Sequence, residues 1–460
     1  MPSRKSAIQL GAILVVMLGG LVALQAASQA RPESSAAPSA QSGALKYLGV
    51  SSCTSTACHH QAVPQDAKGC EYTTWIRHDR HARAYLVLLD ERSKLIEKNF
   101  RRLKTIEEAR PEENPFCLKC HSLDVPERQP GRQVLLADGV SCESCHGPAE
   151  KWLTQHYRPD WQRKTTDEKR ALGMLPTKDL VVRAELCVSC HVGTPETDPI
   201  HDLLGAGHPR INHFELANHL AQMPPHWNER AERSRSPGFE AQAWAVGQVV
   251  SARAALELLA SRAGNKDRPW PEFAEYDCAS CHHDLREPSA RPRPDQGHPQ
   301  LSSLNWSSWY EANLPHALDG KAQAELATIR QLMAERYPDR DQVARLAKAA
   351  ADRLNQALPS VARSRYNNPD LLAQRLGRLA ADQPLQGWDA AAQRYLALTA
   401  VYRTLGDLDP GRRNPRILTS LRTMHGLLDQ PHGIADLHPP RFSAERFLEE
   451  QRKIQDQLRQ

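Results

Sequence analysis

The cysteines of this 460-residue chain constrain its fold most, because ten of the eleven fall in five pairs and each pair is followed directly by a histidine. Four pairs have the spacing Cys-x-x-Cys-His, namely Cys117, Cys120 and His121; Cys142, Cys145 and His146; Cys187, Cys190 and His191; and Cys278, Cys281 and His282. The first pair, Cys53 and Cys58, is wider and precedes His59. A chain with so many paired thiols is organised by something other than a large apolar core.

The spacing has a chemical reason. Two thiols one short turn apart can add to the two vinyl groups of one porphyrin, which forms two thioether bonds. The histidine that follows is then held beside the iron as an axial ligand. We therefore predict five haem c groups, four from the Cys-x-x-Cys-His sites and a fifth at the wider first motif, with His59, His121, His146, His191 and His282 as proximal ligands.

Two other uses of paired cysteines remain open. Two Cys-x-x-Cys pairs could form a four-thiolate zinc site, although such a site gives no reason for a histidine after every pair. Redox-active disulfides of this spacing belong to a βαβ pattern that the flanking sequence lacks. Cys70 is left without a partner in this scheme, and we expect it to be a free or structural thiol.

The second axial ligands are expected to be histidines. Only Met174 and Met223 lie in the motif-bearing region, so methionine cannot serve most sites. Within residues 46–286, the histidines outside the proximal set are His60, His78, His81, His156, His201, His208, His213, His219, His226 and His283. Histidine on both sides of most irons gives rather low-potential electron carriers. For His213 and His219, with no supporting motif, a surface position or a bond to a haem propionate is the preferred interpretation.

The N-terminus has the pattern of an export signal. Arg4 and Lys5 precede the apolar stretch Leu10 to Leu24, and small residues suited to cleavage follow at Ser28-Gln29-Ala30. We predict a signal peptide over 1–30 and a flexible linker over 31–45, which would place the protein in the periplasm or otherwise outside the cytoplasm. The alternative is an uncleaved membrane anchor; no second stretch of spanning length follows.

The rest of the chain predicts a mainly α protein in two parts. Residues 46–286 would form a multihaem domain of short helices and long loops around stacked haems, and 287–314, rich in Arg and Pro, a linker. Residues 315–460 contain no cysteine and show helical periodicity near 326–333, 341–357, 388–402, 412–428 and 443–459, which predicts a helical bundle. Residues 241–262 carry an apolar helical face. The formal charge of +5 is too dilute to indicate nucleic-acid binding.

Several stretches of residues 45–285 resemble the multihaem cytochromes of the cytochrome c-552/4 family, which includes the tetrahaem electron acceptor of hydroxylamine oxidoreductase. The similar stretches are 47–53, Thr74-Trp75, 81–85 (HARAY) and 139–148 (GVSCESCHGP). The resemblance implies that His81 is the first candidate for a distal ligand, followed by His156, His208, His201 and His226. The chain departs from the family in having five sites instead of four, a wider first motif and a long C-terminal extension.

These observations predict an exported electron carrier that passes electrons between donor and acceptor redox proteins through about five haems. The alternative is a multihaem oxidoreductase that acts on a small nitrogen or sulfur compound at one open haem. A haem-based sensor is a third class. The Cys-x-x-Cys-Lys motif of pentahaem nitrite reductases is absent from the sequence.

Overall fold

The computed structural model describes residues 45–64, 67–211, 213–228, 231, 234–282, 304–318, 323–364, 366–381, 385, 387–428 and 442–459. Lys46–Gln460 form one compact unit. The expected signal peptide, nearly all of the 31–45 linker and much of the 287–314 linker lie outside the described residues. As expected, the protein is mainly α-helical; within the described ranges, the pairing between Tyr276 and Trp306 is an isolated β-bridge.

The motif-bearing part consists of short helices. They are η1 (Val50–Cys53), α2 (Glu71–His78), η2 (Arg80–Arg83), η3 (Leu86–Leu89), α3 (Glu91–Arg101), η4 (Ile106–Glu108), α4 (Pro115–His121), α5 (Arg132–Ala137), α6 (Cys142–His146), η5 (Pro159–Arg163), α7 (Thr166–Ala171), α8 (Leu180–His191), α9 (His201–Gly205), α10 (Leu216–Gln222), η6 (Phe273–Glu275) and η7 (Cys278–Ser280). Between 46 and 180, the apolar clusters are small, one around Leu118 and Leu136 and one around Trp152 and Trp161. So little apolar packing cannot by itself stabilise a segment of this length.

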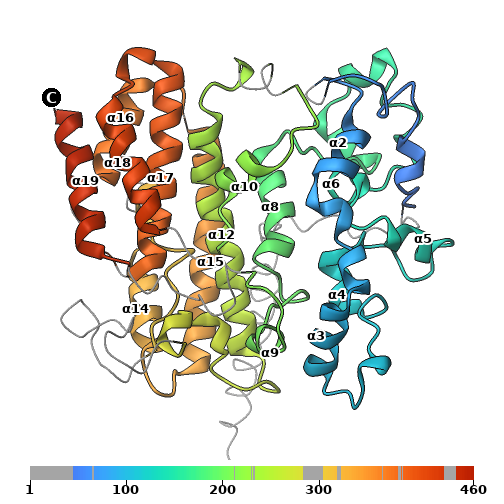
Figure 1. The fold of residues 1–460 in the computed structure, drawn as a ribbon, viewed down its shortest axis with the longest axis horizontal. Helices are drawn as coiled ribbons and strands as arrows, with labels where there is room; N and C mark the ends of the chain where they lie inside the picture. The colour runs from blue at the N-terminus through green and yellow to red at the C-terminus, as the bar shows by residue number, and fades with distance from the viewer. Residues whose placement is uncertain are drawn as a thin grey trace, which may run out of the picture. The chain divides into compact units, whose positions relative to one another are not determined.

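The long helix α12 (Phe239–Gly264) is the structural centre of the remaining chain. It packs along α15 (Arg340–Arg363) and also contacts α8, α10 and α17, as Figure 1 shows. The sequence predicted a helix at 241–262 with one apolar face, and the helix exists. It is buried on nearly every side, however, with Trp244 and Val249 wholly inside, because helices cover it all round.

The C-terminal helices are α13 (Leu314–Ala317), α14 (Gln323–Met333), α15, α16 (Pro369–Leu379), α17 (Gly387–Leu408), η9 (Pro410–Arg412), α18 (Pro415–Leu428) and α19 (Ala444–Arg459). Helix α16 was not expected, although it has clear start signals: Asn368 caps it and Pro369 occupies its first position. One hydrophobic cluster runs from Ala184 to Ile454, so segments on both sides of the expected linker share a core.

No helix in the described part of the chain is both long enough and apolar enough to cross a membrane.

Candidate functional site: five histidine pairs

Three of the cysteine motifs occupy the last turns of helices. Helices α4, α6 and α8 end at His121, His146 and His191. In a helix, residues three and four apart share one face. The spacing Cys-x-x-Cys-His therefore presents two thiols and the imidazole to the same side. The first motif begins at Cys53, the last residue of η1, and continues into a turn, and the fifth begins at η7.

The start of each motif helix is fixed by a local cap. Asn114 accepts the backbone N–H of Phe116 at the start of α4, and Asp179 accepts that of Val181 at the start of α8. A Ser141 capping box begins α6. Such caps satisfy backbone donors that the helix leaves unpaired, so they set the residue at which each short helix begins.

Each predicted proximal histidine lies opposite one predicted distal histidine. The ring centroids are 6.0 Å apart for His59 and His156, 6.1 Å for His191 and His81, 6.2 Å for His121 and His208, 6.4 Å for His146 and His226, and 6.5 Å for His282 and His201. We number the sites by their motifs: first (His59), second (His121), third (His146), fourth (His191) and fifth (His282).

This spacing fits one metal atom between each pair of rings. An imidazole nitrogen binds a transition metal at about 2 Å, and the ring centre lies roughly 1 Å behind that nitrogen. Two rings on opposite sides of one iron therefore have centres about 6 Å apart. The donors fit haem as well, because each pair has two cysteines beside its proximal histidine. Apolar side chains left exposed at Leu86, Leu89 and Leu95 are of the kind that a porphyrin covers.

The ring planes differ among the five sites. At the first site the two imidazoles are nearly parallel, at 11°, and at the fifth they are 25° apart. At the second, third and fourth sites the planes are close to perpendicular, at 86°, 87° and 87°. The sites are therefore distinguishable by ligand orientation.

The fourth site has a second histidine nearby. The His219 ring lies 5.3 Å from that of His191, closer than His81 and outside the range of the other pairs. That distance is short for two rings on opposite sides of one iron, so His81 is the better partner. His213 lies elsewhere, 4.2 Å from Trp309 and 3.1 Å from the carboxylate of Asp389.

In the described part of the chain, no disulfide joins any two of the cysteines. In the part of the chain that the structure describes, no group of three or more His, Cys, Asp or Glu side chains is placed to hold a metal ion. Cys70 is buried and receives a hydrogen bond from Thr74.

Several of the imidazoles are oriented by a hydrogen bond through Nδ1, so Nε2 is the ring nitrogen that remains to bind a metal. The Nδ1–H groups of His121, His156 and His208 donate to backbone carbonyl oxygens at 2.7–2.8 Å. His59 and His81 differ, because they donate to carboxylates: to Glu71 at 3.1 Å and to Asp79 at 2.8 Å. Ligating histidines in metal sites characteristically have such partners.

The electrostatics of the histidines follow these surroundings. Burial lowers the pKa of both His146 and His191 to about 4, so both imidazoles are neutral at pH 7, the form that binds metals. The hydrogen bond to Asp79 raises the pKa of His81. Burial acts to raise the pKa of Asp79 itself, but the bond from His81 leaves that pKa below its ordinary value.

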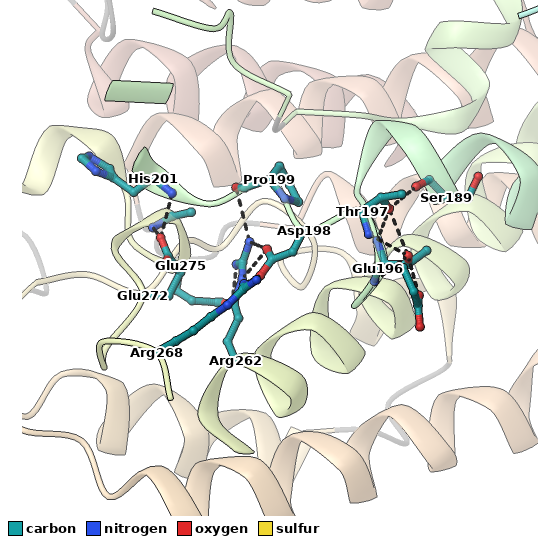
Figure 2. Close-up of polar contacts among 12 residues, drawn as sticks. Ser189, Glu196, Thr197, Asp198, Pro199, His201, Arg262, Arg268, Glu272 and Glu275 are labelled. Atoms are coloured by element: carbon teal, nitrogen blue, oxygen red, sulfur yellow. Dashed lines mark hydrogen bonds and ion pairs between the residues drawn. The ribbon is translucent and has the colours of Figure 1, made fainter. Parts of the chain in front are cut away.

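A buried ion network connects the two halves of the fifth site (Figure 2). Arg262 on α12 contacts Asp198 at 2.6 Å and Glu275 at 2.7 Å, and all three side chains are buried. Asp198 lies three residues before His201, and Glu275 three residues before Cys278. Arg262 thus fastens both ligand-bearing segments to one rigid helix.

Sequence reasoning missed these supporting residues. Asp79, two residues before His81, had a local signal, since an Asp or Asn so placed can cap the turn that carries the histidine. Arg262 had no local signal, because its partners Asp198 and Glu275 lie in other segments of the sequence. Glu143, inside the third motif, is buried and accepts backbone N–H groups of Leu48, Gly49 and Ala149. It joins the start of the described chain to α6.

The paired cysteine motifs and one family match together support a c-type cytochrome, an electron-transfer protein with covalently bound haem. Residues 52–147 match the family model described as cytochrome c554 and c-prime, and this segment contains the first three motifs and His81. Comparison with curated proteins gave no match, and neither did comparison with solved structures.

Proposed function

We propose that the protein is an exported electron carrier with five haem c groups, each bound through two cysteines and coordinated by two histidines. The observation that carries the proposal is the set of five His–His distances of 6.0–6.5 Å, one for every motif. When bound, the haem iron supplies a one-electron ferric/ferrous couple. The residues of this chain supply attachment, ligation and spacing.

Contacts between motifs support transfer along a chain of sites. The thiols of Cys53 and Cys142, which belong to the first and third motifs, lie close enough for each to shift the other's pKa. The thiols of Cys120 and Cys190, of the second and fourth motifs, affect each other's pKa in the same way. Burial raises the pKa of Cys187 in the fourth motif most, and Cys145 of the third motif lies close enough to raise that pKa further. The neighbouring cysteines order the motifs first, third, fourth and second.

A carrier is favoured over an oxidoreductase because each proximal histidine faces a second histidine. Catalysis at haem iron needs an open coordination position. Donor and acceptor would be other redox proteins. The resemblance to the cytochrome c-552/4 family makes a hydroxylamine oxidoreductase a reasonable donor to test. Export follows from the N-terminal pattern of residues 1–30 and suits covalent attachment.

The test is haem content and reactivity. Pyridine haemochrome quantitation and the intact mass of the purified holoprotein should both give five haems per chain. The double variant Cys53→Ala/Cys58→Ala should give four, which assigns the wider motif. The reduced holoprotein should be reoxidised by an external one-electron acceptor and should not turn over nitrite, hydroxylamine or sulfite. Turnover of any of these would favour the oxidoreductase, and fewer than five haems would refute the stoichiometry.

A further inference from the structure

Among the residues that the structure describes, a carboxylate is bonded to a ligand histidine at two of the five sites. At the fourth site, Asp79 Oδ1 accepts Nδ1–H of His81 at 2.8 Å, and at the first site Glu71 Oε2 accepts Nδ1–H of His59 at 3.1 Å. The side chain of Asp79 is 6% exposed and that of Glu71 is 23% exposed. Both carboxylates are therefore at least partly withdrawn from water.

The second site is the natural comparison. There both imidazoles donate to neutral backbone carbonyls: His121 to Ala84 at 2.7 Å and His208 to Pro209 at 2.8 Å. The ligands at this site are as well oriented as those at the first and fourth. The difference between the sites is a negative charge, not the presence of a hydrogen bond.

That charge has a defined effect on a haem iron. Reduction adds one electron to the ferric iron and removes one positive charge from the site. A carboxylate bonded to the ligand histidine favours the ferric state for two reasons. Its negative charge attracts the ferric iron more strongly than the ferrous iron, and its hydrogen bond makes the imidazole a stronger electron donor. Attraction is strongest where water is excluded, so Asp79 should act more strongly than Glu71.

Building on the five-haem function proposed above, we propose that Glu71 and Asp79 are potential-setting residues that hold the reduction potentials of the first and fourth sites below that of the second. In the contact order first, third, fourth, second, the two lowered sites are then separated by the third.

Amide variants isolate the charge. Glu71→Gln and Asp79→Asn keep an oxygen that can accept the imidazole N–H, and asparagine also remains a good cap for the turn at Asp79. Asp138→Asn is the matched control, because Asp138 accepts the backbone N–H of Val50 at 2.8 Å and the structure gives it no bond to a ligand histidine. All three substitutions remove one negative charge from the same part of the chain.

The measurement is a spectroelectrochemical titration of the holoproteins, with electron paramagnetic resonance (EPR) to assign each shifted site. Asp79→Asn should change the reduction equilibrium of one haem about tenfold in favour of the ferrous state. For one electron, this raises its midpoint potential by about 59 mV. Glu71→Gln should raise a different one by less. The near-parallel rings at the first site and perpendicular rings at the fourth give different low-spin signals, so the two shifts can be assigned.

The proposal is overturned if both amide variants keep five low-spin haems and leave every potential within the change seen for Asp138→Asn. It is also overturned if the shifts are downward. Failure of the five-haem function would look different, because the unmodified protein would then contain fewer haems or a high-spin iron.

Discussion

Replacement of Arg262 by methionine should open the fifth site. The guanidinium lies between Asp198 and Glu275, and the three side chains are only 8%, 6% and 8% exposed. Removing one partner of a buried ion pair costs about 3–5 kcal/mol, because the remaining charge is left uncompensated. Here Arg268 still contacts Asp198 at 2.9 Å, and the Trp306 indole still donates to Glu275. We therefore expect a loss near the lower end, about 3 kcal/mol.

The local consequence is more specific than the loss of stability. Asp198 and Glu275 hold the segments that carry His201 and the fifth motif. When these segments separate, one iron in five should lose its sixth ligand and become high-spin. The assays are denaturant unfolding followed by circular dichroism and EPR of the oxidised holoprotein.

Arg253→Met is the matched control. Arg253 lies on the same helix and also contacts two carboxylates, but Glu185 and Glu257 are 43% and 47% exposed. Exposed pairs contribute at most about 1 kcal/mol. Asp198→Asn and Glu275→Gln, added to Arg262→Met, should restore stability because they remove the uncompensated charges. The reasoning is refuted if Arg262→Met unfolds like Arg253→Met and keeps five low-spin haems.

Four further substitutions test other parts of the structure. His81→Ala should convert the fourth haem to high-spin while His219→Ala leaves it low-spin, and the reverse result in EPR would make His219 the ligand. Burial raises the pKa of Glu215 to about 7, so its proton is lost near pH 4.5 when unfolded but near pH 7 when folded. The free energy of unfolding should therefore fall as the pH rises from 4.5 to about 7. In denaturant titrations, Glu215→Gln should remove up to about 3 kcal/mol of that fall, and identical pH profiles for the two proteins would contradict this. Gly147 has φ +78°, and a Cβ there would overlap the carbonyl oxygen of Gly173. Gly147→Ala should therefore lower the stability by at least about 1 kcal/mol in thermal unfolding. An unchanged melting temperature would be incompatible with that geometry.

Local patterns in the sequence predicted much of the site. The spacing within each cysteine motif works through one helical turn, so it can be recognised without knowing the fold. The long helices of the C-terminal part were recognised because residues such as Leu326 and Ile329 recur at helical spacing and are buried. The candidate distal histidines were chosen because methionine is scarce in the motif-bearing region and because of the family resemblance. Helical periodicity did not indicate them.

What the sequence could not supply depends on contacts across the chain. Nothing near Arg262 indicates that it joins residues on both sides of the fifth site. The all-round burial of α12 follows from α15 and α17 covering it, and these helices begin far along the chain. The assignment of each distal histidine to its proximal partner is of the same kind, since His191 pairs with His81, 110 positions earlier in the sequence.

Quantitative EPR of the fully oxidised holoprotein tests the central claim most directly. Five histidine pairs at 6.0–6.5 Å predict five low-spin ferric irons per chain, two with near-parallel and three with perpendicular ligand planes. A high-spin ferric signal that integrates to one iron per chain, and that shifts when nitrite, hydroxylamine or sulfite is added, would contradict the carrier with five closed sites.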